Sequence, residues 1–207
     1  GTGRMMRFAK PLSLALLAGS IAGPAAALDY VNPPFYDEYV ETTELQQVEE
    51  RLPDNPLVVD PEALGLKSGR HGGVLKMLMR KAKETRQMVV YGYARLVKYD
   101  RNLNLVADIL HSVDEIDGRI FTLKLRKGHK WSDGTPFTSE DFRYWWEDIA
   151  HNEDLSPVGP PSSLKVNGKL PTVEFRDSHT VRYSWEQPNP TFLPQLAKAS
   201  PAYIYAP

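Results

Sequence analysis

The chain of 207 residues has the composition of an ordinary globular protein, with 42% hydrophobic and 25% charged residues. Its formal net charge of −1 shows no overall bias toward nucleic acid or an anionic membrane, so we expect no nucleic-acid partner. There is no cysteine, which excludes a disulfide framework, a thiolate metal site and a cysteine nucleophile. A lipid anchor is not expected either, because it requires a cysteine directly after a signal peptide.

The first 27 residues have the pattern of a secretory signal peptide. Three basic residues lie within residues 1–10, an apolar run covers residues 11–21, and residues 25–27 are all alanine. The run is shorter than the roughly 20 apolar residues that span a bilayer, and a buried N-terminal helix is the alternative interpretation. We therefore predict that residues 1–27 direct export to the periplasm.

Residues 28–70, called the entry segment below, are rich in proline and acidic residues and contain one short apolar run, at residues 57–59. Residues 41–51 predict a short polar helix that ends near Pro53. The rest is typical of extended chain that wraps over a domain and is partly disordered.

The sequence changes character after the entry segment, and we expect a folded domain over residues 71–207. Residues 74–79 predict a short apolar strand. Residues 88–97 predict an apolar helix, which Gly92 weakens. The other expected features of this stretch are a charged loop at residues 80–86, a turn at 99–104 and a short apolar segment at 105–110.

The clearest local pattern begins after Gly118, which permits a turn. Residues 121–125 alternate apolar and polar side chains, as in a strand with one buried face. Thr138 is a good N-cap with Asp141 at the third helical position, close to a capping box. A strand followed by a helix is therefore predicted over residues 113–151.

The predicted helix carries an apolar stripe whose burial would dock it on a sheet, since each large side chain contributes roughly 1.5–3 kcal/mol. Trp145 and Trp146 are candidates for ligand stacking, but their place in the stripe favours the core. Arg143 and Glu147 form an i,i+4 pair on the polar side. The stripe consists of Phe142, Trp145, Trp146 and Ile149.

The last third of the domain predicts a β-hairpin and a short helix. Residues 173–175 and 181–185 alternate apolar and polar side chains on either side of a turn at residues 177–179. Residues 191–197 follow as a short helix. The predicted fold class is α/β, in its α+β form.

The stretch from Gly118 to Asp141, GRIFTLKLRKGHKWSDGTPFTSED, resembles the extracellular solute-binding proteins of family five. That family includes the oligopeptide- and dipeptide-binding components of ABC importers. The likeness covers roughly residues 71–205, and residues 72–73 and 94–110 also look like the opening of that family. The motif positions are Leu125, Arg126, Gly128, Trp131, Asp133, Gly134, Pro136, Phe137, Thr138 and Asp141.

The resemblance implies the N-terminal part of a two-lobed, type II periplasmic-binding-protein-like fold, in which the lobes close on the ligand around a hinge. Family members are much longer, so we expect that the chain is a truncated fragment that ends inside the first lobe. The acidic residue that pairs with the amino terminus of a peptide is then absent. His129 stands where the family usually has an aliphatic residue, which predicts different packing there.

In the family the ligand lies between the lobes, and the loop after the first strand and the next helix face that cleft. Aromatic side chains with a few polar groups suit a peptide or sugar. The alternative is that the tyrosines pack in the core and the charged residues form a solvated loop. The candidate ligand-binding residues are Arg80, Lys83, Thr85, Arg86, Gln87, Tyr91 and Tyr93.

We expect a monomeric, periplasmic substrate-binding component of an ABC importer, not an enzyme. It would bind peptides, with oligosaccharides as the second choice, and deliver them to the transmembrane permease subunits. The five histidines lack metal-ligand spacing, so we expect no metal and no cofactor. The pairs Glu140-Asp141 and Glu147-Asp148 point to an alternative, a secreted glycan-active enzyme, but they lie where a helix favours acids anyway.

Overall fold

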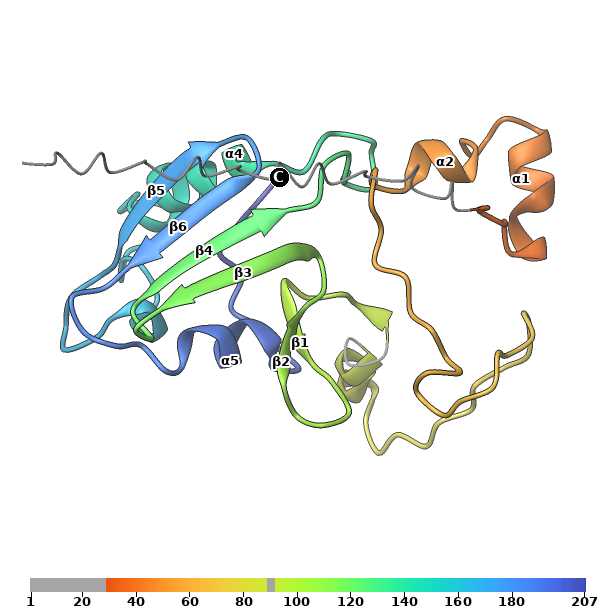
Figure 1. Cartoon of the computed structure of the whole chain (residues 1–207), viewed down its shortest axis with the longest axis horizontal. Coiled ribbons are helices and arrows are strands. Elements are labelled where there is room, and N and C mark those ends of the chain that lie inside the picture. The colour runs from red at the N-terminus through yellow and green to blue at the C-terminus, as the bar shows by residue number, and fades with distance from the viewer. Residues whose placement is uncertain (1–28, 89–91) are drawn as a thin grey trace, which may run out of the picture. The chain divides into compact units, whose positions relative to one another are not determined.

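The computed structural model describes residues 29–88 and 92–207 (Figure 1). The chain divides into one unit of residues 1–30 and a second of residues 31–207, and the description below concerns the second. The predicted signal peptide, residues 1–27, lies outside the described residues. No helix among the described residues is long and apolar enough to cross a membrane.

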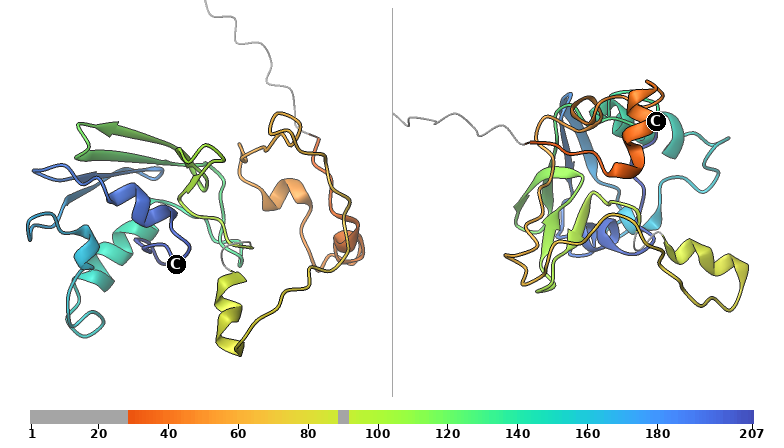
Figure 2. Two further views of the ribbon diagram at one scale, coloured as in Figure 1. Left: turned by 90° about the horizontal axis from the view of Figure 1, so that it is seen from below. Right: turned by 90° about the vertical axis from the view of Figure 1, so that its right-hand side faces the viewer.

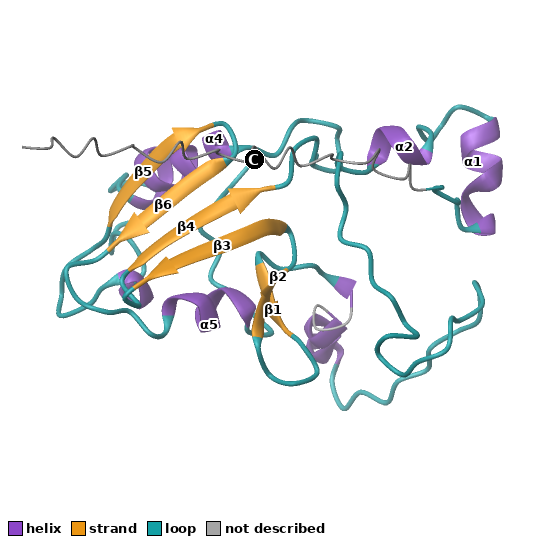
Figure 3. Ribbon diagram, in the orientation of Figure 1, coloured by secondary structure: helices purple, strands orange, loops and turns teal. Residues whose placement is uncertain are grey.

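The largest element is a four-stranded antiparallel sheet in the order β3-β4-β6-β5 (Figure 3). The predicted strand and the predicted hairpin are both confirmed. The β3–β4 turn places Asp117 and Gly118 at φ of 53° and 63°, as a two-residue Asp-Gly hairpin turn requires. The bounds are β3 Leu110–Ile116, β4 Ile120–Leu125, β5 Thr172–Asp177 and β6 Thr180–Ser184.

A second, two-stranded sheet pairs β1 (Val97–Tyr99) with β2 (Leu105–Ala107), so the predicted turn at residues 99–104 is confirmed. The predicted helix over residues 88–97 is wrong at its C-terminal end, and its residues 89–91 lie outside the described residues. The backbone there pairs across the chain instead, since the Leu96 carbonyl oxygen accepts from the amides of Asp108 and Leu110.

The helix α4 (Ser139–Arg143) begins at a complete capping box, which confirms that prediction. The Thr138 hydroxyl accepts from the Glu140 amide at 3.2 Å, and the Asp141 carboxylate accepts from the Thr138 amide at 2.7 Å. The helix continues as a π-helical segment, η3 (Tyr144–Ala150). Two short elements complete this part of the chain, η4 (Ser162–Leu164) and α5 (Phe192–Ala197), the latter confirming the predicted last helix.

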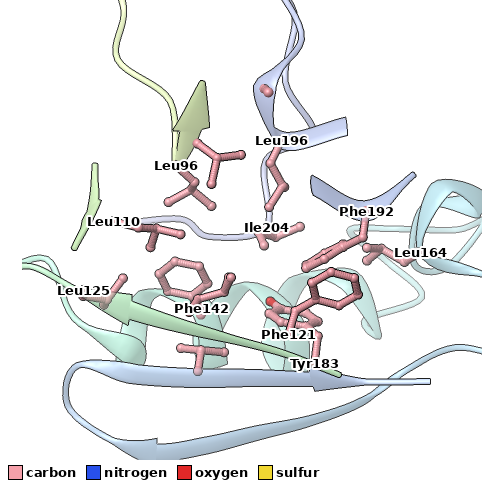
Figure 4. Packing of buried hydrophobic residues seen from close by; sticks show 14 of the residues in the cluster. Leu96, Leu110, Phe121, Leu125, Phe142, Leu164, Tyr183, Phe192, Leu196 and Ile204 are labelled. Atoms are coloured by element: carbon pink, nitrogen blue, oxygen red, sulfur yellow. The ribbon is translucent and has the colours of Figure 1, made fainter. Parts of the chain in front are cut away.

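The helices α4 and α5 cover the same face of the sheet (Figure 2), and side chains from all three meet in one core (Figure 4). Phe142 of α4 is fully buried, while Trp145 and Trp146 are half-buried and pack against the core, in agreement with the core interpretation of the stripe. Phe192 of α5 contacts the ring of Phe121 on β4 at 5.1 Å between centroids. The sheet and its two helices therefore form one packed layer pair.

The entry segment contains short helices instead of the single helix predicted over residues 41–51. The chain turns out of α1 at Thr43, which has a left-handed φ of 62°. A β-branched residue rarely adopts this conformation, and sequence pattern alone does not reveal it. The elements are η1 (Pro34–Tyr36), α1 (Asp37–Glu41) and α2 (Val48–Arg51).

The strand predicted over residues 74–79 does not form, and this prediction is wrong. No strand of the described residues pairs with this run, so its backbone has no ladder of hydrogen bonds. Its side chains are exposed, by 83% at Val74 and 73% at Leu75. Residues 62–83 are exposed without interruption.

Candidate functional site

The candidate ligand-binding residues whose side chains the structure describes are exposed, and several of the candidates are carried by the 3₁₀ helix η2 (Ala82–Met88). The Glu84 carboxylate anchors the start of this helix, because it accepts from the Arg80 amide at 2.8 Å and pairs with the Arg80 guanidinium at 3.5 Å. The Thr85 hydroxyl donates to the Ala82 carbonyl oxygen at 2.9 Å. These contacts are local and leave the charged ends of the side chains in solvent.

The stretch is strongly basic. Residues 67–88 contain seven lysines and arginines and one acidic residue, Glu84. Lys83 and Arg86 are exposed, and neither has an ion-pair partner in the described part of the chain. Exposed ammonium and guanidinium groups can bind a carboxylate, and Arg does so with two parallel hydrogen bonds.

Tyr93 marks the other end of the candidate stretch and is 66% exposed. The next anchor is Arg95, whose guanidinium donates to the carbonyl oxygens of Tyr93 and Lys198, each at 2.9 Å. The Arg95 amide also donates to the Asp108 carboxylate at 3.0 Å. Arg95 therefore holds the backbone of Tyr93 against the folded part of the chain.

The structure does not bring all the candidates together. Tyr91 and the side chain of Gln87 lie outside the described residues. Two hollows of about 470 and 450 Å³ are lined by residues of other segments, including Trp185 in the first and Trp131 in the second. Sequence reasoning missed the positioning residue Arg95, because its partner Lys198 is about a hundred positions away and no local pattern signals the contact.

The acidic residues considered for catalysis are engaged in structural contacts. The Arg143 guanidinium bonds to Glu140 at 2.6 Å, to Glu147 at 2.8 Å and to Asp148 at 3.0 Å. The hydrogen bonds from Arg143 lower the pKa of Glu140, whereas a general acid needs a raised pKa. Among the described residues no group of three potential ligands could hold a metal ion.

The turn after β4, which carries the resemblance motif, has a scaffold role. Gly128 and Gly134 have φ of 72° and 89°, which favour glycine, and Thr138 caps α4. Arg126 is buried, with 8% of its surface exposed, and donates to the carbonyl oxygens of Asn55 and Asp108. The motif that carries the resemblance therefore positions backbone, and within the described part of the chain its hydrogen bonds go to residues other than the ligand-binding candidates.

Residues 104–206 match the family model described as bacterial extracellular solute-binding proteins, family 5 middle region. This match begins before β2 and extends past α5, so it covers the whole four-stranded sheet. The chain belongs to the family 5 solute-binding proteins. The resemblance drawn from the motif after β4 is thereby confirmed.

Similar proteins include the periplasmic oligopeptide-binding protein OppA of Escherichia coli (strain K12), 32% identical over 104 residues, or 44% of this chain and 19% of that protein. The periplasmic alpha-galactoside-binding protein of Rhizobium meliloti (strain 1021) is 25% identical over 185 residues, or 80% of this chain and 27% of that protein.

A solved structure of an oligopeptide-binding protein OppA superposes with a TM-score of 0.68 and 30% identity. It covers 85% of this chain, which in turn covers 27% of that structure. The fold is therefore part of a type II periplasmic binding protein. The chain spans about a fifth to about a quarter of the length of the relatives that it matches.

Proposed function

We propose that this chain is part of the substrate-binding component of an ABC importer, which binds a small solute and delivers it to the transmembrane permease subunits. The observation that carries the proposal is the family match over residues 104–206, supported by the superposition on an oligopeptide-binding protein. Ligand binding with lobe closure requires no chemistry at the site. The contacts of Glu140, Glu147 and Asp148 with Arg143 give the alternative of a glycan-active enzyme no support.

The first proposed ligand class is peptide. The name of the OppA relative states that it binds oligopeptides. Exposed cations without an ion-pair partner suit the carboxylate end of a peptide, and an exposed tyrosine suits its side chains. The residues proposed to contact the ligand are Arg80, Lys83, Thr85, Arg86, Gln87, Tyr91 and Tyr93.

Oligosaccharide is the second candidate class, and the extent of one match favours it. The alpha-galactoside-binding protein matches 80% of the chain, more than the roughly two thirds that residues 71–207 make up. That sequence match therefore includes part of the entry segment, whereas the sequence match to the Escherichia coli OppA covers 44% of the chain and the superposition on an OppA structure covers 85%.

The remaining proposals concern location and organisation. Residues 1–27 are a cleaved signal peptide, residues 28–70 an entry segment and residues 71–207 part of the first lobe. The protein acts as a monomer in the periplasm, without a lipid anchor. Relatives named as periplasmic support this location.

Thermal unfolding of residues 28–207 with a panel of tri- to pentapeptides and a panel of alpha-galactosides tests both ligand classes. A ligand that binds only the folded state raises the unfolding temperature, by an amount that grows with its concentration. Because the ligand in the family lies between two lobes, we expect little or no shift for residues 28–207 alone and, for the full-length gene product, a shift with peptides that Arg86→Gln abolishes and Arg176→Gln retains. Arg176 is a matched control, because it is an exposed arginine on β5, outside the candidate stretch.

A shift with alpha-galactosides alone would replace the first ligand class by the second. If neither panel raises the unfolding temperature of residues 28–207, the same assay is repeated on the full-length gene product, and its result decides between the ligand classes. No shift with either panel in that assay would contradict the proposed function.

A further inference from the structure

Part of the entry segment is fastened to the end of β4. The Asp54 amide donates to the Lys127 carbonyl oxygen at 2.9 Å, and the Arg126 guanidinium donates to the Asn55 carbonyl oxygen at 2.9 Å. The Lys130 ammonium donates to the Glu50 carbonyl oxygen. Residues 50–55, called the strap below, are thus tied to residues 126–130 by three hydrogen bonds.

The strap approaches the turn so closely that only glycine fits at position 128. A Cβ atom on Gly128 would collide with the Asp54 carboxylate, and the φ of 72° is itself strained for other residues. Arg126 lies beneath this contact, buried, and its recorded partners are carbonyl oxygens of Asn55 and Asp108. The contact therefore contains a buried positive charge that no carboxylate neutralises among the described residues.

His129 is half-buried and lies in sequence between Gly128 and Lys130, which both approach the strap. Its ring packs edge-on against Phe137, with 5.7 Å between the centroids. Its Nδ1 atom is buried and has no hydrogen-bond partner in the part of the chain that the structure describes. A buried nitrogen without a partner costs less as the uncharged imidazole than as an N–H group that needs an acceptor.

The charges around the ring do not favour a second cation. Burial lowers the pKa of His129, and the positive charge of Arg126 lowers it further. The Asp141 carboxylate of α4 is occupied by the Thr138 amide and by the Trp131 indole at 3.0 Å. No carboxylate pairs with His129 among the described residues. The charged groups on the surrounding elements are Arg126, Lys127, Lys130, Asp54 and Asp141.

We propose that His129 is an acid-sensitive switch that releases the strap from the end of β4 when its imidazole takes up a proton. The protonated ring would place a second positive charge beside Arg126 and a buried N–H group without an acceptor. The cost of the second charge is relieved when Arg126, and the strap that it holds through the Asn55 carbonyl oxygen, moves away from the ring. The consequence is an entry segment whose attachment depends on the acidity of the surroundings.

The direction of the pH dependence follows from linkage. A folded-state pKa below the ordinary value of 6.5 means that the unfolded chain binds more protons than the folded chain in the range below 6.5. The attachment is therefore fully present above pH 6.5. It is lost as the pH falls from there through the lower folded-state pKa.

Hydrogen exchange of the Asp54 amide, corrected for the intrinsic effect of pH, measures release directly, because this amide donates to Lys127 across the contact. We expect its protection to fall severalfold, and by no more than about tenfold, between pH 7.5 and 5.5 in the natural sequence, because one imidazole with an ordinary pKa of 6.5 can shift the equilibrium by no more over this range, and to stay unchanged in His129→Leu. The Trp185 amide, which donates to Arg119 in the sheet, should keep its protection in both. His111→Leu removes an exposed histidine on β3 and should behave as the natural sequence does.

A titration of the imidazole resonances by NMR provides a test that needs no folded variant. We expect the His129 midpoint to lie below 6.5 and the Asp54 amide to lose protection over the same pH range. A His129 midpoint at or above 6.5 would overturn the proposal. Equal loss of protection at Asp54 in His129→Leu would overturn it as well, because release would then not depend on this ring.

Discussion

The four-stranded sheet and the exposed stretch at residues 62–83 contain similar apolar side chains but use them in opposite ways. Leu110 and Leu123 on the sheet are fully buried, whereas Val74 and Leu75 are mostly exposed. The difference lies in the partners, since β4 pairs with a strand on each side and has two helices over one face. An apolar run becomes a strand only where neighbours accept its backbone hydrogen bonds and cover its side chains.

Truncation of one large apolar side chain in each region should give the largest contrast. Phe142→Ala should lower the free energy of unfolding by about 3–5 kcal/mol, because it leaves a cavity in the core. Leu78→Ala should change it by less than about 0.5 kcal/mol, because that side chain is fully exposed. Urea unfolding of residues 28–207 measures both. Equal losses would show that the exposed stretch is packed in solution.

Two glycine substitutions sharpen the comparison at the strap. Alanine at Gly128 or Gly134 should cost about 1–2 kcal/mol through left-handed strain alone. Gly128→Ala should cost more, because its Cβ atom also displaces Asp54, whereas Gly134 has open space around it. Chemical unfolding of the two variants measures the difference. A smaller loss for Gly128→Ala would indicate that the strap is not attached.

A cap deletion in each region should give a smaller contrast. Thr138→Ala removes the N-cap of α4 and should cost about 1 kcal/mol. Thr85→Ala removes a local hydrogen bond within the exposed η2 and should cost less than about 0.5 kcal/mol of global stability. Circular dichroism during thermal unfolding distinguishes them, and comparable losses would place η2 inside the cooperative unit.

The smallest effect is expected at the β1–β2 turn, between the two regions. The backbone amide and the side-chain amide of Asn104 donate to the Asp100 carboxylate, and so does the backbone amide of Asn102. These hydrogen bonds lower the pKa of Asp100. Their contribution is present above pH 3.8, the ordinary value, and is lost as the pH falls through the lower folded-state pKa. Asp100→Asn should remove this part of the acid dependence in unfolding curves recorded between pH 5 and 2. An unchanged acid dependence would contradict this assignment.

Local sequence patterns predicted those elements whose signals lie within a few residues of one another. The Asp117-Gly118 turn, the alternation along β4 and the Thr138–Asp141 capping box each specify their geometry at short range. The strand over residues 74–79 failed because its pairing partner is not contained in the local pattern. The helix over residues 88–97 failed for a related reason, since the backbone at Leu96 pairs with residues 108–110.

The candidate site divides in the same way. The family resemblance located the candidate stretch from Arg80 to Tyr93. Its positive charge could be predicted from the composition of residues 67–88. The anchoring of Tyr93 through Arg95 to Lys198 joins residues about a hundred positions apart, and no local pattern encodes it. The position of the Tyr93 backbone, which we propose lies near the ligand, is thus set by contacts that are distant in sequence.

For this protein the sequence by itself determined the family and the local elements of the sheet region, because turns, caps and alternating strands depend on neighbouring residues. Only the tertiary structure decided which apolar runs were buried, which acids were occupied by Arg143, and how the strap meets the turn at Gly128. Those outcomes depend on the free energy of contacts between distant segments, which local pattern does not specify.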